Sequence, residues 1–336
     1  MGETAGWQTG PRNAITDVPG IRVGHYTDRR GATGCTVILC EDNTGVAVDT
    51  RGGAPGTRET DVLNPANLVR TCHAIVFSGG SAFGLASADG VARWLAEHDI
   101  GFPTSARKVP IVPAAILYDL GIGDPMAFPS AEAGYIAASR ARAGAVAVGS
   151  VGAGTGATVA KLLGMEGRAL KGGIGTASAV GPRGIIVGAL VATNAVGSIF
   201  DPQTGQCVAG PRADDGSFVP LAEAMGMRTA QMDALLENTT LMCIATNAKL
   251  ESHQLQRIAM QAHDGFARVV SPAHTFADGD VAFAVSMGQL EIQPHDALTI
   301  GVLASRAIEQ ALLSSVLLAK GAKGIPGVAQ WCSAHR

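Results

Sequence analysis

Aromatic and charged side chains are scarce in this sequence of 336 residues, at 4% and 16% respectively. The formal net charge is only −3, which gives no electrostatic basis for binding nucleic acid or an anionic membrane surface. The sequence has no C-x-x-C pair, no H-E-x-x-H and no histidine spacing typical of a metal site, so no metal is expected. The G-x-x-x-x-G-K-[ST] phosphate loop and the G-x-S-x-G nucleophile elbow are absent as well.

A long hydrophobic run and a leader-like start are also missing. The longest apolar stretch, from Gly184 to Phe200, is interrupted by Thr193, Asn194 and Gly197, which makes it a poor membrane span. The first residues lack the basic and apolar regions of a signal peptide. Four of the six cysteines lie in apolar runs, as buried free thiols do in a reducing compartment. We therefore expect a cytoplasmic protein with no membrane partner.

Apolar residues and glycine are abundant: 47% of the residues are apolar, and 44 are glycine. The length leaves room for one large domain or two. Strand-like and helix-like patterns follow one another without strict β-α-β alternation, which favours a layered α/β fold over a doubly wound parallel sheet. We expect hairpins over 14–26 and 35–50, an exposed connection over 201–227, a short helix over 229–236, buried strands over 185–192 and 281–285, and helices over 81–98, 131–141, 251–268 and 297–319.

The most informative stretch joins Asn238 to Thr239, directly before an apolar run that ends at Asn247. The run is typical of a buried strand, so Thr239 would be its first residue. A hydroxyl at that position can attack the carbonyl of Asn238, and hydrolysis of the resulting ester would cut the chain there. Thr239 would then carry a free α-amine, which titrates at about 7.7–8.0 and can act as base for its own hydroxyl.

Ordinary structural roles also fit these residues. Asn tolerates left-handed backbone and Thr suits strands, so most Asn-Thr pairs are turns or strand edges. Asn238-Thr239-Thr240 also matches the N-glycosylation pattern, which matters only in a secreted eukaryotic protein. The stretch alone therefore leaves self-cleavage as one hypothesis among three.

Two glycine-rich segments suggest anion binding. Gly152-x-Gly154-x-x-Ala157 matches a loose dinucleotide fingerprint, but it lacks the acidic residue expected about twenty positions later. The second segment contains Gly79, Gly80 and Ser81 and precedes the helix expected over 81–98, with Ser81 as the candidate N-cap. The N–H groups of this turn could bind a substrate oxyanion at the start of the helix.

An acidic cluster precedes the strand expected at 281–285. Asp278 and Asp280 flank a glycine, which suits a tight turn. The same pair could instead orient a protonated α-amine or relay a proton. The histidines give no further signal, and His263 and His274 are interpreted as ordinary helix or loop residues.

Three further polar residues lie in apolar or glycine-rich surroundings. Asn194 ends an apolar run, where its amide can complete a turn or donate a hydrogen bond to an oxyanion. Lys161 and Lys171 are the only lysines between Lys108 and Lys249. A lone lysine is usually solvated, but one beside a nucleophile lowers the cost of a developing negative charge.

Six segments of the chain, taken together and in order, resemble one known family. They are Ile15–His25, Arg51–Thr60, Gly79–Leu85, Lys171–Thr176, Asn238–Thr240 and Asp278–Asp280. The family is that of the autoproteolytic hydrolases that include L-aminopeptidase/D-esterase, the β-peptidyl aminopeptidases and the nylon-oligomer (6-aminohexanoate-oligomer) endo-hydrolase. The resemblance runs over residues 13–325.

The resemblance implies a four-layer α/β/β/α sandwich, similar to N-terminal-nucleophile hydrolases but with its own connectivity. It implies a single hydrolase domain, 1–336, that cuts itself into an α chain, 1–238, and a β chain, 239–336, which stay together. The processed enzyme would hydrolyse amide bonds of small peptides or amides through an acyl-enzyme on Thr239. It would need no cofactor or metal and would form a homo-oligomer, a tetramer of αβ units.

The resemblance also assigns catalytic roles to numbered residues. The matches are Thr239 as nucleophile, Asn194 as oxyanion donor, Asp278 and Asp280 as the acidic pair of the nylon-oligomer branch, and Tyr118 and Lys161 as further active-site residues. Lys171 is the alternative to Lys161, because the glycine-rich segment between them admits two alignments.

Some features depart from the family pattern and leave the substrate open. Many aminopeptidase members carry Ser as nucleophile, whereas this chain has Thr preceded by Asn. The acidic residue with which β-peptidyl aminopeptidases hold an amino group is not identified here, so aminopeptidase and endo-amidase activity both remain possible. Two other functions are alternatives: an acyltransferase, since ornithine acetyltransferase has a related fold and a Thr nucleophile, and a non-catalytic protein whose glycine loops bind a phosphate or nucleotide.

Overall fold

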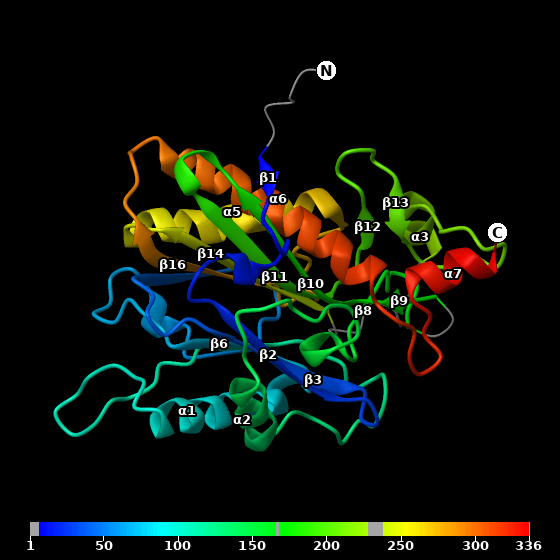
Figure 1. Ribbon diagram of the computed structural model, residues 1–336. Coiled ribbons are helices and arrows are strands. Elements are labelled where there is room, and N and C mark those ends of the chain that lie inside the picture. The colour runs from blue at the N-terminus through cyan, green and yellow to red at the C-terminus, as the bar shows by residue number, and fades with distance from the viewer. Residues whose placement is uncertain (1–6, 166–167, 228–237, 336) are drawn as a thin grey trace.

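Four layers make up the fold in the computed structural model of the chain, which describes residues 7–165, 168–227 and 238–335 (Figure 1). Helices α5 (Ser252–Val269) and α6 (Asp296–Leu317) cover one outer face, and α1 (Ser87–Glu97) and α2 (Ala131–Ser139) cover the other. Two β-sheets lie face to face between these helix layers. The expected four-layer α/β/β/α sandwich is thus confirmed.

The two large sheets each contain one parallel strand pair. The six-stranded sheet runs in the order β1 (Gln8–Thr9), β10 (Gly173–Val180), β11 (Ile186–Asn194), β14 (Thr239–Ala248), β16 (Val281–Leu290), β4 (Gly45–Thr50). The five-stranded sheet runs in the order β2 (Arg22–Asp28), β3 (Thr33–Leu39), β6 (Ala74–Ser78), β7 (Ala114–Ile116), β5 (Thr57–Arg58). The parallel pairs are β14–β16 and β6–β7, and all other neighbours in these two sheets are antiparallel.

Smaller elements flank the sandwich. A three-stranded sheet contains β13 (Cys207–Ala209), β12 (Ser198–Phe200) and β15 (Val270–Ser271), and a two-stranded sheet contains β8 (Thr158–Val159) and β9 (Leu170–Lys171). Helices α3 (Leu221–Met227) and α7 (Val328–Ala334) lie near them (Figure 1). The expected exposed connection over 201–227 is therefore partly wrong, because β13 and α3 form within it. The helix expected over 229–236 lies outside the described residues.

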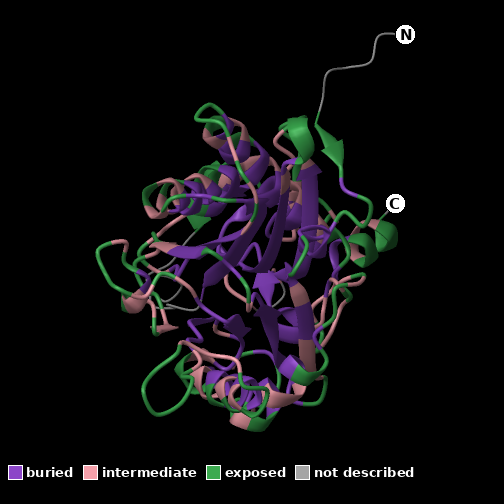
Figure 2. Ribbon diagram, turned by 60° about the vertical axis from the view of Figure 1, so that its left-hand side comes forward, coloured by how far each residue is buried: buried purple, intermediate pink, exposed green. Residues whose placement is uncertain are grey.

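Alternation along β14 determines which residues face which layer. Leu241 and Cys243 belong to the apolar core between the two sheets, and Met242 and Ile244 belong to the core beneath α5 and α6. Figure 2 shows the strands as the buried centre of the molecule, with the exposed residues on the outer helices and loops. Because side chains alternate with a period of two, Thr239 faces the layer between the sheets.

The two expected hairpins are wrong. Residues 35–50 contain β3 and β4, but these strands belong to different sheets, so the chain crosses between layers there. Residues 15–17 form a 3-10 turn, and the first strand of that region, β2, begins at Arg22 and pairs with β3. Local alternation predicts that a segment is a strand, but it does not specify the strand's partner.

The helix expected over 131–141 begins at the predicted residue, but the predicted N-cap of the helix expected over 81–98 is wrong. Ser130 caps α2, since its Oγ accepts the N–H of Ala133 at 3.4 Å. Ser81 is not an N-cap: Gly80 holds that position with φ 78°, and Ser81 itself has φ 51° and opens a 3-10 segment that precedes α1. An N-cap residue typically has extended backbone, whereas Gly80 and Ser81 are both left-handed and form a tight turn.

Helix α6 is long and apolar enough to cross a membrane by length and composition, with 61% of its most apolar window buried inside the fold. It packs against β10, β11 and α5. The packing accounts for its hydrophobicity in the way expected of a core helix.

Candidate active site

The carbonyl oxygen of Asn238 receives two hydrogen bonds at the start of β14. The Thr239 hydroxyl donates to it at 2.5 Å, and the Gly279 N–H donates to the same oxygen at 2.9 Å. Thr239 is only 3% exposed, so these contacts lie where water screens them little. The arrangement supplies a nucleophilic oxygen at the preceding peptide bond and a donor for the oxyanion that attack would create.

Gly279 lies at a close approach between two segments. Asn238 and Asp278 form a parallel bridge, which brings Gly279, the residue after Asp278, beside Thr239. A Cβ at position 279 would lie 2.7 Å from Thr239 Oγ1 and 2.7 Å from the carbonyl oxygen of Ala54. Any larger residue would therefore displace the hydroxyl or the Ala54 backbone.

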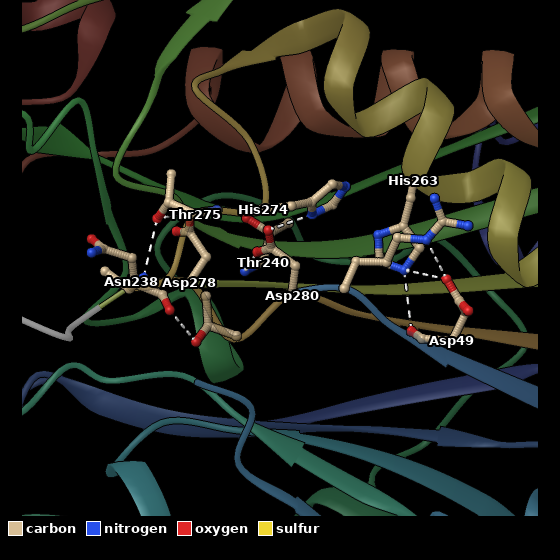
Figure 3. Close-up of polar contacts among 11 residues, drawn as sticks. Asp49, Asn238, Thr240, His263, His274, Thr275, Asp278 and Asp280 are labelled. Atoms are coloured by element: carbon tan, nitrogen blue, oxygen red, sulfur yellow. Dashed lines mark hydrogen bonds and ion pairs between the residues drawn. The ribbon is translucent and has the colours of Figure 1, made fainter. Parts of the chain in front are cut away.

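Asp278 lies beside Asn238 and is held by Thr275 (Figure 3). Its Oδ2 accepts the Thr275 N–H at 2.9 Å and the Thr275 hydroxyl at 2.6 Å. Burial, followed by the negative charge of Asp280, raises the pKa of Asp278 above its usual value, and the Thr275 hydrogen bonds and the charge of Lys161 oppose the rise. A carboxyl of this kind can exchange a proton closer to neutral pH than an ordinary aspartate.

Asp280 uses its two oxygens on two different partners (Figure 3). Oδ1 accepts the N–H of Thr240 at 2.7 Å, and Oδ2 lies 2.9 Å from Nδ1 of His274. The carboxyl is completely buried. It therefore fixes the backbone of Thr240, the residue after Thr239.

Asn194 lies directly opposite Thr239, because β11 and β14 pair in that register. Alternation along β11 puts Asn194 on the same face as Thr239, toward the layer between the sheets. Its Oδ1 accepts the N–H of Thr158 at 2.9 Å and lies 3.1 Å from Nζ of Lys161. These two donors fix which end of the amide is the acceptor, so Nδ2 is held as a donor.

Of the two candidate lysines, Lys161 contacts Asn194, whereas Lys171 contacts other residues. Nζ of Lys161 also lies 3.1 Å from the backbone oxygen of Asn194. Nζ of Lys171 instead donates to the carbonyl oxygens of Thr155 and Ala157, at 2.9 and 2.5 Å. The geometry therefore favours Lys161 as the active-site lysine.

Tyr118 joins the site from the end of the five-stranded sheet, just after β7. Its backbone oxygen accepts Nδ2 of Asn194 at 3.0 Å. Tyr118, Lys161 and Thr158 also line one small cavity. Through these contacts the structure brings together the six residues predicted to be catalytic, which are Thr239, Asn194, Asp278, Asp280, Lys161 and Tyr118.

The turn at Gly79, Gly80 and Ser81 uses its N–H groups inside the fold. They donate to the oxygens of Gly34 at 2.9 Å, Asp119 Oδ1 at 2.7 Å and Leu117 at 3.1 Å, respectively. An oxyanion would have to displace acceptors that the fold already supplies. The geometry therefore does not support the oxyanion role predicted for this turn.

The glycine-rich segment around Gly152 also uses its N–H groups inside the fold. The N–H groups of Gly152 and Ala153 donate to the hydroxyls of Thr27 and Thr36, at 2.9 and 3.1 Å. These bonds hold the segment against β2 and β3. The fingerprint that suggested a phosphate site is thus a structural connection between the layers.

Sequence reasoning missed several contributors to the site. The oxyanion donor on Asn238 is a backbone N–H, from Gly279, and residue type carries no signal for it. His274 was interpreted as ordinary, yet its ring contacts Asp280. Thr275 was findable, since a Thr three residues before an Asp suits a local side chain–backbone turn.

A metal site is not evident: among the described residues, no three His, Cys, Asp or Glu side chains converge so that they could hold a metal ion.

Sequence comparisons bear on what this site does. The family model described as peptidase family S58 matches residues 13–329. An uncharacterised aminopeptidase of Mycobacterium leprae (strain TN) is 42% identical over 94% of this chain and 93% of its own length. The 6-aminohexanoate-oligomer endohydrolase of Kocuria sp. (strain KY2) is 28% identical over 91% of this chain and 87% of its own length.

Solved structures agree on the fold. A Burkholderia sp. β-aminopeptidase matches with a TM-score of 0.72 and 24% identity over 99% of this chain and 96% of its own. The L-aminopeptidase D-Ala-esterase/amidase of Ochrobactrum anthropi is described as a variant among the Ntn hydrolase fold. It matches with a TM-score of 0.72 and 23% identity, over 95% of this chain and 90% of its own. The family match and the 42%-identical relative favour amide hydrolysis over acyl transfer and phosphate binding. The chain belongs to peptidase family S58 and is a hydrolase of peptide or amide bonds with the N-terminal-nucleophile type of fold.

Proposed function

We propose that the chain cuts itself between Asn238 and Thr239 and that Thr239, then the first residue of the β chain, is the nucleophile of the hydrolase. The observation that carries the proposal is the shared contact on Asn238 O, with the Thr239 hydroxyl at 2.5 Å and the Gly279 N–H at 2.9 Å. The products are the α chain, 1–238, and the β chain, 239–336. They stay together because β14 lies between β11 and β16 in the centre of the six-stranded sheet.

Self-cleavage begins with attack of Thr239 Oγ1 on the carbonyl carbon of Asn238. The new C–O bond forms, the C–N bond breaks, and the hydroxyl proton passes to the departing amine. Gly279 stabilises the negative charge on the carbonyl oxygen through its N–H. Water then hydrolyses the ester, which restores the Thr239 hydroxyl and leaves a carboxylate on Asn238.

Turnover uses the freed α-amine of Thr239. An α-amine has an ordinary pKa of about 7.7–8.0, so near neutral pH it can take the hydroxyl proton as Oγ1 attacks a substrate carbonyl. Asn194, opposite Thr239, donates the second hydrogen of Nδ2 to the oxyanion while the first stays on the Tyr118 carbonyl, and Lys161 adds positive charge beside it. Asp278 and Asp280 hold the amine when it is protonated.

We infer small peptides or amides as substrates. Thr239 is almost completely buried, which disfavours a large folded protein as substrate. The relative at 42% identity is named an aminopeptidase and the one at 28% an endohydrolase, so the higher identity favours aminopeptidase activity over endo-amidase activity.

Assembly and compartment are part of the proposal. A homo-oligomer, a tetramer of αβ units, would cover exposed apolar side chains such as Phe276 and Met126, which are 93% and 80% exposed in the single chain. A cytoplasmic location is supported by the free cysteines, including Cys40 and Cys72, whose sulfurs lie 3.6 Å apart without a bond. Light scattering of the purified protein tests the assembly.

Intact-mass measurement of the matured protein tests the central step. Wild type should give fragments of about 24 and about 10 kDa by share of the chain, in place of the 34.1 kDa species. Thr239→Ala should remain whole and inactive, because it lacks the oxygen, and Thr239→Ser should retain part of both reactions. Thr240→Ala is the matched control, since it leaves the Thr240 N–H and the nucleophile in place. Cleavage in Thr239→Ala with loss of cleavage in Thr240→Ala would move the scissile bond and refute the assignment.

A further inference from the structure

A line of buried and half-buried polar side chains leads from Asp280 across the six-stranded sheet, away from Thr239 (Figure 3). Asp280 Oδ2 lies 2.9 Å from His274 Nδ1. The His274 ring meets the ring of His263 on α5 edge to face, with centroids 4.7 Å apart. Nε2 of His263 lies 3.1 Å from the backbone oxygen of Asp49 on β4. The reaction steps described above use neither ring.

The contacts of His274 select one tautomer. The ionised carboxylate of Asp280 can only accept, so the hydrogen lies on Nδ1 of His274. Nε2 is buried and has no hydrogen-bond partner among the described residues, so a proton there would be an unsatisfied buried donor. The ring therefore donates from Nδ1 to Asp280.

The backbone and the neighbours of His274 fix the direction of the ring. Its φ of 53° lies in the left-handed region, a conformation that persists in a non-glycine residue only where the surroundings enforce it. Phe266 of α5 lies against the ring at 5.0 Å between centroids. The titratable groups that face the ring are Asp280 and His263, and behind His263 stand the ion-paired Asp49 and Arg51, with Arg51 Nε 2.6 Å from Asp49 Oδ2.

We propose that His274 is a positioning residue for self-cleavage and turnover: it donates to one oxygen of Asp280 and so directs the other oxygen to the Thr240 N–H. The Thr240 N–H bond, at 2.7 Å, fixes the backbone immediately after Thr239. Loss of the His274 donor would leave Oδ2 of Asp280 without this hydrogen bond and loosen the start of β14. The inference rests on the role of Asp280 proposed above.

A pair of variants tests the donor. Leu and Asn have the same branched shape, but Asn keeps an N–H donor and tolerates left-handed backbone. His274→Leu should slow self-cleavage and lower kcat by about 10- to 100-fold. His274→Asn should recover most of both losses. Equal losses in the two variants would reduce the ring to packing and overturn the proposal.

Two further variants isolate the route through Asp280. His25→Leu is a matched control, because the Nδ1 of His25 also makes one side-chain contact, with Thr36 Oγ1 at 2.9 Å, but in the five-stranded sheet. It should lower the melting temperature without slowing self-cleavage or turnover. In an Asp280→Asn background, His274→Leu should change kcat by less than about 2-fold. Fully additive losses would show that His274 does not act through Asp280.

A spectroscopic readout separates this inference from the proposed function. If Thr239→Ala still cleaves, the nucleophile is wrong, but ¹⁵N-histidine NMR of the whole protein still tests the link. His274 should show a protonated Nδ1 at neutral pH, and Asp280→Asn should shift that signal. A His274 ring protonated at Nε2 alone in wild type would overturn the inference whatever the activity.

Discussion

Gly279 leaves room for the Thr239 hydroxyl, and its N–H donates to the carbonyl oxygen of Asn238. We expect Gly279→Ala to slow self-cleavage by on the order of 10²-fold, because the new Cβ would lie 2.7 Å from Thr239 Oγ1 and must displace it. The measurement is the appearance of the β chain over time, by mass spectrometry. Gly144→Ala, where an added Cβ meets nothing within 4 Å, should process like wild type. Normal processing of a folded Gly279→Ala protein would place the hydroxyl elsewhere.

Asn194 and Gly279 should affect the two reactions differently, because each donates to a different oxyanion. The Gly279 N–H lies on the scissile carbonyl, whereas the Asn194 amide is proposed to act on substrate. Asn194→Ala and the nearly isosteric Asn194→Asp, which lacks the donor, should each lower kcat by about 10²–10³-fold. Self-cleavage should slow less than turnover in both variants. Equal effects on the two reactions would mean that Asn194 supports only the shape of the site.

Prediction from sequence at the residue scale depended on the kind of group. Side chains with a chemical identity could be named, and Thr239, Asn194 and Asp280 do come together. The choice between Lys161 and Lys171 could not be made, because both lie in glycine-rich sequence and only the path of the chain distinguishes them. Backbone donors could not be predicted at all, since any residue carries an N–H.

The secondary-structure elements show why a strand is easier to predict than its partner. The helices expected over 251–268 and 297–319 correspond closely to α5 and α6, because their apolar positions repeat with the helical period. The hairpin expected over 35–50 failed because β3 and β4 lie in different sheets. Sheet membership depends on contacts far apart in sequence, which a local pattern does not contain.

The contact between β10 and α6 also depends on glycine. A Cβ at Gly175 would lie 1.9 Å from the backbone oxygen of Ala311, so the helix rests directly on the strand backbone. Gly175→Ala should lower the free energy of unfolding by about 1–3 kcal/mol, because the helix layer has to move outward. Urea denaturation measures the change, with Gly144→Ala as control. An unchanged midpoint would mean that α6 can shift at no cost.

At the scale of the whole molecule, the resemblance to a family predicts the four layers, whereas the order of strand-like and helix-like patterns predicts only a layered α/β fold. The order of strands could not be predicted, because it depends on where the chain crosses between sheets. The fold also buries charge between its layers. Lys171 is fully buried, and burial lowers its pKa to about 7, against an opposing effect of the negative charge of Asp119.

That buried amine makes the stability of the molecule depend on pH. Above its folded pKa of about 7 and below its ordinary value of 10.5, Lys171 is neutral in the folded chain but protonated in the unfolded chain. Unfolding then takes up a proton, so stability rises with pH. Relative to Lys171→Met, the free energy of unfolding of wild type should increase by up to about 1.4 kcal/mol per pH unit in that window. Urea denaturation at several pH values measures the difference.

The same comparison for Lys108→Met, at an exposed lysine paired with Asp99, should be flat. A flat profile for Lys171→Met as well would show that the ammonium stays charged inside the fold, with the carboxylate of Asp119 as its counter-ion.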